Sequence, residues 1–311
     1  MKPRRQRQAD GHCAEVFTGG LDRGLSFTSL LRRSAQRLVV FSIALIFIAV
    51  FTAGCSNEAE EKAFFRAERA LGEGEHLEAI AFYRIFVEDF PESEFAPEAQ
   101  YKIGVVYDSH LKNITKALDA YSMLLYLYPG SPEATLAREQ RAKVYSSWGR
   151  HRESIAEYAW MLEYGSEERA GGYRYNIALE YIKMGDYGQA RIELDELIKS
   201  APPEKLLSNA YYQVATALQL GGNYSGAVEA YDLFIEKFPG HKLTSDALLH
   251  KATVLEQSGK LKEALALMKE LRVRYPELSE ALAIKIASAE KRFSNGPKLN
   301  KKRKRRRRRR K

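Results

Sequence analysis

The stretch that decides the fold is residues 210–239, AYYQVATALQLGGNYSGAVEAYDLFIEKFP. Two small residues, Ala215 and Ala227, flank a glycine turn, and the bulky Tyr231 follows one helical turn after the second. Small residues let two helices approach closely, and an aromatic ring one turn later fills the space beside them. Pro239 lacks an N–H donor and ends the second helix. The stretch therefore predicts two α-helices packed as a pair.

The same pattern recurs six times at spacings of 36 to 38 residues. The first column of small residues is Ala67, Gly104, Ala142, Ala178, Ala215 and Ala252. The second is Ala79, Ala117, Ser154, Ala190, Ala227 and Ala264, and the bulky column is Tyr83, Tyr121, Tyr158, Leu194, Tyr231 and Met268. The turn between the helices of a pair falls at Gly74, Asn113, Gly149, Gly185, Gly222 and Gly259. We assign the three columns to the core and give them no ligand role.

This pattern resembles the tetratricopeptide repeat and covers residues 61–276. The resemblance implies an all-α fold, a right-handed superhelical solenoid of about six helix pairs. Residues 277–293 keep a helical period through Leu278, Ala281, Ile284 and Ile286. We expect this segment to be a helix that caps the open face of the last pair.

The chain starts with a presequence over residues 1–54 that has the layout of a signal peptide. Residues 38–54 contain no charge and follow three arginines, Arg32, Arg33 and Arg37. A permanent membrane span needs about 20 apolar residues in a helix, so this run is marginal as a span and sufficient for export. The alternative is an uncleaved signal anchor in the inner membrane.

The stretch Thr52-Ala53-Gly54-Cys55 resembles a bacterial lipobox, although Thr52 stands where leucine is usual. The resemblance implies that the thiol of Cys55 carries a diacylglycerol and that residues 55–60 tether the repeats to the lipid. Ser56 next to the cysteine resembles lipoproteins that are sorted to the outer membrane. We therefore expect a lipid anchor at the outer membrane, with the repeats facing the periplasm.

The net charge of +9 is unevenly distributed along the chain. Residues 1–54 carry +5 and residues 297–311 carry +12, which leaves −8 for residues 55–296. The predicted repeats are thus acidic, and no specific nucleic-acid partner is expected. The polybasic tail within residues 294–311 cannot fold by itself, because its charges repel one another. Its candidate partners are anionic lipid, lipopolysaccharide or an acidic protein surface.

The sequence carries no catalytic motif: it has no phosphate-binding loop, no H-E-x-x-H and no nucleophile elbow. No two histidines have the spacing that would place two metal ligands on one helix face. His76 and His151 are expected to be exposed turn residues. The sequence therefore predicts a protein that is no enzyme and holds neither cofactor nor metal.

The first helices of successive pairs line the concave face, where tetratricopeptide families usually receive a peptide. On these helices we predict groove contacts at Tyr101, Asp108, Tyr175, Tyr212 and Gln219. Tyrosine combines a large apolar face with a hydroxyl, and it is common at recognition surfaces. A tyrosine at helical spacing can equally be a packing residue. Both interpretations stay open for the three tyrosines.

An exported, lipid-anchored array of such repeats resembles the BamD-like lipoproteins of the outer-membrane β-barrel assembly machinery. The resemblance covers the lipobox and the repeats, mainly residues 61–131, whereas the segment YGSEERAGGYRYNIALEYIKMGDY and the basic tail depart from that family. It implies a scaffold that holds client or partner proteins in its groove. Alternatives are another periplasmic scaffold, for Tol-Pal, secretion or pilus assembly, and an adaptor that binds nucleic acid or another anionic polymer through the tail.

Overall fold

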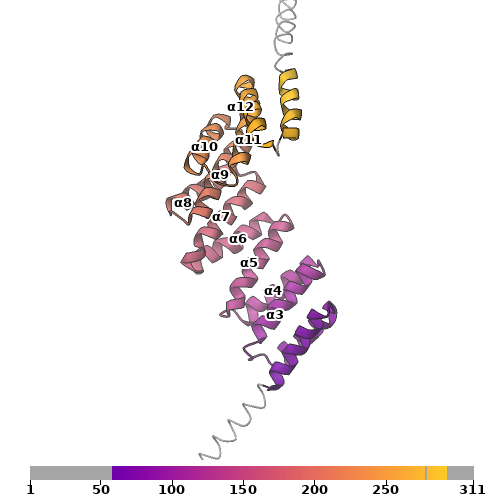
Figure 1. Cartoon of the computed structure of the whole chain (residues 1–311). Coiled ribbons are helices and arrows are strands. Elements are labelled where there is room, and N and C mark those ends of the chain that lie inside the picture. Colours follow the sequence, from indigo (N-terminus) through magenta and orange to yellow (C-terminus); the bar gives the residue numbers. More distant parts are fainter. Residues whose placement is uncertain (1–57, 277–278, 293–311) are drawn as a thin grey trace, which may run out of the picture. The chain divides into compact units, whose positions relative to one another are not determined.

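The structure is a computed structural model that describes residues 58–276 and 279–292. In these two ranges the chain forms thirteen α-helices, one short π-helix and no strand. The helices follow one another as six pairs and a closing helix (Figure 1). The predicted all-α solenoid is confirmed. The presequence, residues 55–57 with Cys55, and the polybasic tail lie outside the described residues.

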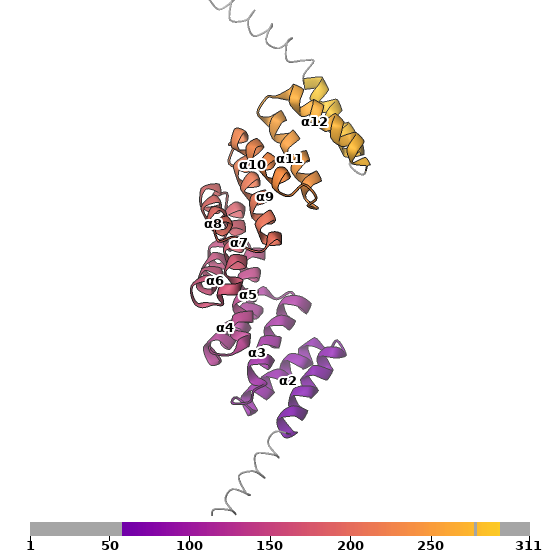
Figure 2. The ribbon, with the colours of Figure 1, turned by 60° about the vertical axis from the view of Figure 1, so that its left-hand side comes forward.

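The helices that pack together are close neighbours in the sequence, as expected for a solenoid (Figure 2). The first helices of the pairs are residues 58–72, α3 (Ala96–Val105), α5 (Pro132–Ser147), α7 (Glu167–Met184), α9 (Glu204–Leu220) and α11 (Thr244–Gln257). The second helices are α2 (His76–Asp89), α4 (Ile114–Leu127), α6 (His151–Tyr164), α8 (Tyr187–Lys199), α10 (Tyr224–Lys237) and α12 (Leu261–Arg274). The closing helix spans residues 279–292.

The three sequence columns form the core of the pairs. Every alanine in the two small columns is fully buried, and the bulky residues are at most 5% exposed. Tyr231 illustrates the geometry: its ring lies at 6.0 Å from that of Tyr212 on the preceding helix, and its hydroxyl donates to Gln219 Oε1 at 2.9 Å. The bulky side chain thus joins both helices of its pair, which explains why the column recurs.

The second pair has one residue more than the others between its two small columns. Gly104 and Ala117 are 13 positions apart, whereas this separation is 12 in the other five pairs. A helix can accommodate one inserted residue as a π-helical turn. The π-helix η1 (Val106–His110) directly continues α3 and provides that turn.

The insertion also changes the turn that follows η1. In the other five pairs a glycine has a φ between 77° and 84° at this point, but in the second pair Lys112 takes the left-handed conformation with a φ of 52°. Asn113 lies in this turn, as predicted, and also caps α4, since its side chain accepts a hydrogen bond from the Lys116 N–H at 3.1 Å. Lys112, one residue earlier, occupies the position that corresponds to the glycines of the other turns.

The closing helix covers the last pair, as predicted, but with a different face. Leu282 and Ile286 are buried in the cluster that contains Met268, and Ala289 is also buried. Ile284, expected among the covering residues, is 70% exposed. The buried residues are spaced by four and three positions, so they share one helix face, and Ile284 lies off it.

Ser154 stands in the second small column, where the five other pairs have alanine. Its side chain is fully buried, and its hydroxyl has no hydrogen-bond partner among the described residues. A buried hydroxyl without a partner costs about 1 kcal/mol or more. We therefore expect Ser154→Ala to raise the free energy of unfolding by about 1 kcal/mol, measured by urea denaturation.

The matched control is Ser208→Ala. Ser208 is as fully buried as Ser154, but its hydroxyl donates to the Lys205 carbonyl at 3.1 Å and lies 3.2 Å from His241 Nε2. This variant should lose about 1 kcal/mol, since it removes hydrogen bonds that are made. Equal effects of the two substitutions would show that the hydroxyl of Ser154 is in fact satisfied.

Candidate protein-binding face

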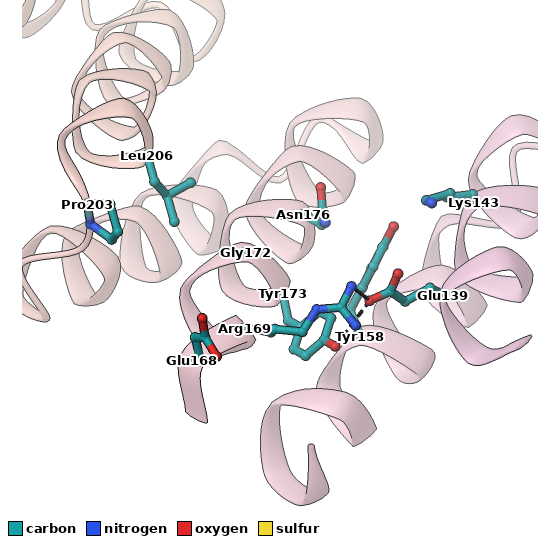
Figure 3. A pocket seen from close by; sticks show the side chains of 10 residues that line it. All are labelled: Glu139, Lys143, Tyr158, Glu168, Arg169, Gly172, Tyr173, Asn176, Pro203 and Leu206. Carbon is teal, nitrogen blue, oxygen red and sulfur yellow. Dashed lines mark hydrogen bonds and ion pairs between the residues drawn. The ribbon is translucent and has the colours of Figure 1, made fainter. Parts of the chain in front are cut away.

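The face formed by the first helices of the pairs contains two open hollows. The first, which we call the Gly172 hollow, has a volume of about 350 Å³ and opens over α5, α7 and the start of α9 (Figure 3). It is lined by Glu139, Lys143, Tyr158, Glu168, Arg169, Gly172, Tyr173, Asn176, Pro203 and Leu206. The volume lies within the range of ordinary ligand sites in proteins.

Paired charges fix one wall of the Gly172 hollow. Arg169 forms an ion pair with Glu139, and the Tyr173 hydroxyl donates to Glu139 Oε1 at 3.1 Å (Figure 3). Burial, together with the negative charges of Glu180 and Glu139, raises the pKa of Tyr158 to about 12, so its hydroxyl remains protonated at neutral pH. The wall is polar, and the rings of Tyr158 and Tyr173 are buried in it.

Two successive glycines in α7 create the space of this hollow. A Cβ at Gly171 would lie 3.1 Å from Leu206 Cδ2, so glycine lets α7 and α9 approach closely. A Cβ at Gly172 would meet nothing within 4 Å, because that residue faces the open hollow. A glycine pair weakens a helix, and its presence points to a spatial requirement.

The second hollow, the Lys112 hollow, has a volume of about 400 Å³ and lies between the second and third pairs. It is lined by Asp108, Lys112, Ile114, Gln140, Lys143, Val144 and Ser147. Lys143 lines both hollows. A segment that passes from one hollow to the other therefore crosses this lysine.

The structure places the sequence-predicted groove residues on three helices and at η1. Asp108 lines the Lys112 hollow, and Tyr101 accepts a hydrogen bond of 3.4 Å from Gln140 of the same hollow. Tyr175 and Tyr212 are partly buried, and burial raises the pKa of each phenol. Gln219 is engaged by Tyr231. The tyrosines have packing contacts, and a contact with a partner stays a prediction for all five residues.

A buried carboxylate that the sequence analysis did not identify joins the third and fourth pairs. Glu180 is 3% exposed and accepts hydrogen bonds from Ser146 Oγ and Lys183 Nζ, while His151 Nδ1 also lies within 2.7 Å of it. Burial raises the pKa of Glu180, but the hydrogen bonds from Lys183, Ser146 and His151 outweigh burial, so its pKa lies below the ordinary value. This network fixes the angle at which α5, α6 and α7 meet.

The prediction for the two turn histidines was wrong. His151 is partly buried beside Glu180, and the ring of His76 lies 4.2 Å from the ring of His110.

Within the described parts of the chain, no group of three or more histidine, cysteine or acidic residues has the arrangement of a metal site. None of the described helices combines the length and the apolar character that a membrane span requires.

Comparison with known proteins identifies the repeats. Two family models, both described as tetratricopeptide repeat, match residues 98–131 and residues 175–242 and 212–279. A search among curated proteins found no match. Residues 171 and 172 thus lie outside the matched segments, as does the whole third pair.

Solved structures with similar folds include a tetratricopeptide repeat protein from Parabacteroides merdae, at 16% identity and a TM-score of 0.51, covering 75% of this chain and 93% of that one. PilW, a type IV pilus biogenesis factor, has 18% identity and a TM-score of 0.48, with 72% and 98% of the two chains covered. MamA has 17% identity and a TM-score of 0.48, with 60% and 96% covered. At these identities the likeness concerns the fold alone. The matched segments are therefore tetratricopeptide repeats, and the described helices have the fold of such a repeat array.

Proposed function

We propose that this protein is a non-enzymatic scaffold that holds an extended segment of a partner protein in the Gly172 hollow. A lipid on Cys55 anchors it at the outer membrane, facing the periplasm, where it takes part in the assembly of outer-membrane β-barrel proteins. The anchor and the assembly role rest on the sequence resemblances described above. The binding role rests on the hollow itself.

The observation that carries the binding role is the open floor at Gly172. The neighbouring wall already has its charges paired, through Arg169 and Glu139, so it does not require a charged ligand. Asn176 lines the same space, and its side-chain amide suits the backbone amide groups of an extended peptide. Lys143 lines both this hollow and the Lys112 hollow, so a segment that extends past Lys143 would reach the second hollow.

Gly172→Leu should block this hollow without damage to the fold. The new side chain points into open space, and leucine is a better helix former than glycine by roughly 1 kcal/mol. The free energy of unfolding should therefore stay the same or rise by up to about 1 kcal/mol. Recovery of partner proteins from envelope extracts should fall about tenfold or more, since buried contacts at a binding centre are worth roughly 2 kcal/mol or more.

Gly72→Leu is the matched control, since a Cβ at Gly72 also meets nothing within 4 Å and Gly72 lines neither hollow. Its partner recovery should equal that of the unaltered protein. If Gly172→Leu recovers partners as well as the control does, the Gly172 hollow is not the binding site.

Cell-envelope biochemistry tests the anchor and the assembly role separately. Labelled fatty acid should be incorporated into the protein and lost in Cys55→Ala. The lipidated protein, purified from its own envelope with and without residues 298–311, should retain subunits of the β-barrel assembly machinery. Absence of label would overturn the anchor, and absence of those subunits would overturn the assembly role while leaving the binding site open to another periplasmic partner.

A further inference from the structure

The Lys112 hollow contains two solvent-exposed lysines that have no carboxylate partner among the described residues. Lys112 and Lys143 both line it, and within residues 58–276 and 279–292 neither forms an ion pair. Three other lysines on first helices of the pairs are paired with carboxylates, whereas the exposed Lys205 of α9 is among those that form no ion pair with the described residues. Lys102 contacts Glu68 at 2.5 Å, Lys183 contacts Glu180 at 2.7 Å, and Lys251 contacts Asp232 at 2.5 Å.

The backbone holds Lys112 in this position through the inserted residue of the second pair. The π-helix η1 ends at His110, and Lys112 follows in the left-handed conformation that glycine occupies in the other five turns. A non-glycine residue in this conformation costs of order 1 kcal/mol or more. Strained residues and π-helical turns both concentrate at functional sites.

The remaining lining residues define the charge balance of the hollow. Asp108 supplies one negative charge against the two lysines, so the hollow has a net charge of about +1 in a repeat region that is acidic. Gln140 and Ser147 are uncharged and can pair with peptide amide groups. An anionic group is therefore the ligand that this hollow complements best.

We propose that the segment held by this face places an acidic side chain, glutamate or aspartate, between Lys112 and Lys143. The inference rests on the proposed binding role, since the segment reaches the Lys112 hollow from the Gly172 hollow across Lys143. The carboxylate forms the ion pairs that the two lysines lack, and it selects partner segments with an acidic residue a few positions from the part seated at Gly172. The lysines thus determine specificity, whereas the Gly172 hollow provides space.

An array of decapeptides tests this selection with the purified full chain. The peptides are made in matched pairs that differ only by glutamate or glutamine at one position, and binding is measured by fluorescence. The glutamate member should bind about five to ten times more tightly in those pairs whose variable residue reaches the Lys112 hollow, the effect of two partly exposed charge pairs. Higher salt should reduce this preference, because exposed charges are screened.

Variants locate the preference on the two lysines. Lys112→Gln combined with Lys143→Gln should abolish the preference for glutamate, and Lys143→Arg should keep it. Lys262→Gln is the matched control, because Lys262 is an exposed lysine of α12 that lines neither hollow. The preference of the Lys262→Gln variant for glutamate peptides should equal that of the unaltered protein.

The outcomes separate this inference from the proposed binding role. Peptides that bind and lose affinity in Gly172→Leu, but show no preference for glutamate, would overturn the acidic selection alone. A preference for glutamate that survives in the double lysine variant would also overturn the acidic selection alone. If no peptide in the array binds the unaltered chain, both the binding role and the acidic selection are wrong.

Discussion

Gly104→Ala is expected to lower the free energy of unfolding by about 2–3 kcal/mol. A Cβ at Gly104 would lie 2.4 Å from Cε1 and 2.5 Å from Cδ1 of Tyr121, whose ring is fully buried between α3 and α4. The ring cannot move aside, so the helices must separate. The loss should appear in urea denaturation, even though alanine is the better helix former by about 1 kcal/mol.

Two further variants identify the clash as the cause. Gly172→Ala makes the same substitution in α7, where the new methyl group meets nothing within 4 Å, and it should raise stability by about 0.5–1 kcal/mol. Combining Gly104→Ala with Tyr121→Leu should cost less than the sum of the two single losses, because leucine leaves room for the methyl group. Strict additivity would contradict the proposed clash.

Glu180→Ala is expected to lower the free energy of unfolding by about 3 kcal/mol. The substitution removes the shared acceptor of Ser146, His151 and Lys183 and leaves an empty space where the buried carboxylate was. Glu193→Ala is the matched control: its carboxylate pairs with Arg174 at 2.8 Å near the surface and should be worth less than about 1 kcal/mol. Equal losses would mean that the Glu180 network adds no stability of its own.

The contribution of Glu180 should depend on pH. Its pKa is lower in the folded protein than in the unfolded chain, where a glutamate titrates near 4.3. The ionised carboxylate therefore stabilises the fold above about pH 4.3, and this stabilisation is lost as the pH falls through the lower, folded pKa. The stability difference between the unaltered protein and Glu180→Gln should be largest near neutral pH and shrink below about pH 4. A difference that is constant down to pH 3 would show that the charge of Glu180 plays no part.

The core could be predicted from the sequence because each column has a local cause. A small residue at Ala215 or Ala252 is required wherever two helices touch, and a repeat presents the same requirement six times. The single extra residue between Gly104 and Ala117 was also visible, but whether a helix bulges or a loop lengthens depends on neighbouring helices that the sequence does not specify. The left-handed conformation of Lys112 could not be predicted for that reason.

The Glu180 network and the residues that line the two hollows were harder to predict from the sequence. The Glu180 network takes side chains from three helices, and a carboxylate in a helical pattern normally indicates a solvent-facing position. The predicted tyrosines lie on the first helices of the pairs, but none of them lines either hollow, since a ring at that position also packs against the bulky column. The Gly171-Gly172 pair in α7 was the one signal in the sequence that marked the Gly172 hollow.

The π-helix makes the second pair different from the other five pairs of the array. Five of the six units have the same number of residues between their two small columns, so one of these units could replace another. The second unit differs, because a copy of another unit in its place would remove Lys112 from the turn. The added residue therefore makes the second pair the one unit whose turn a copy of another unit could not reproduce.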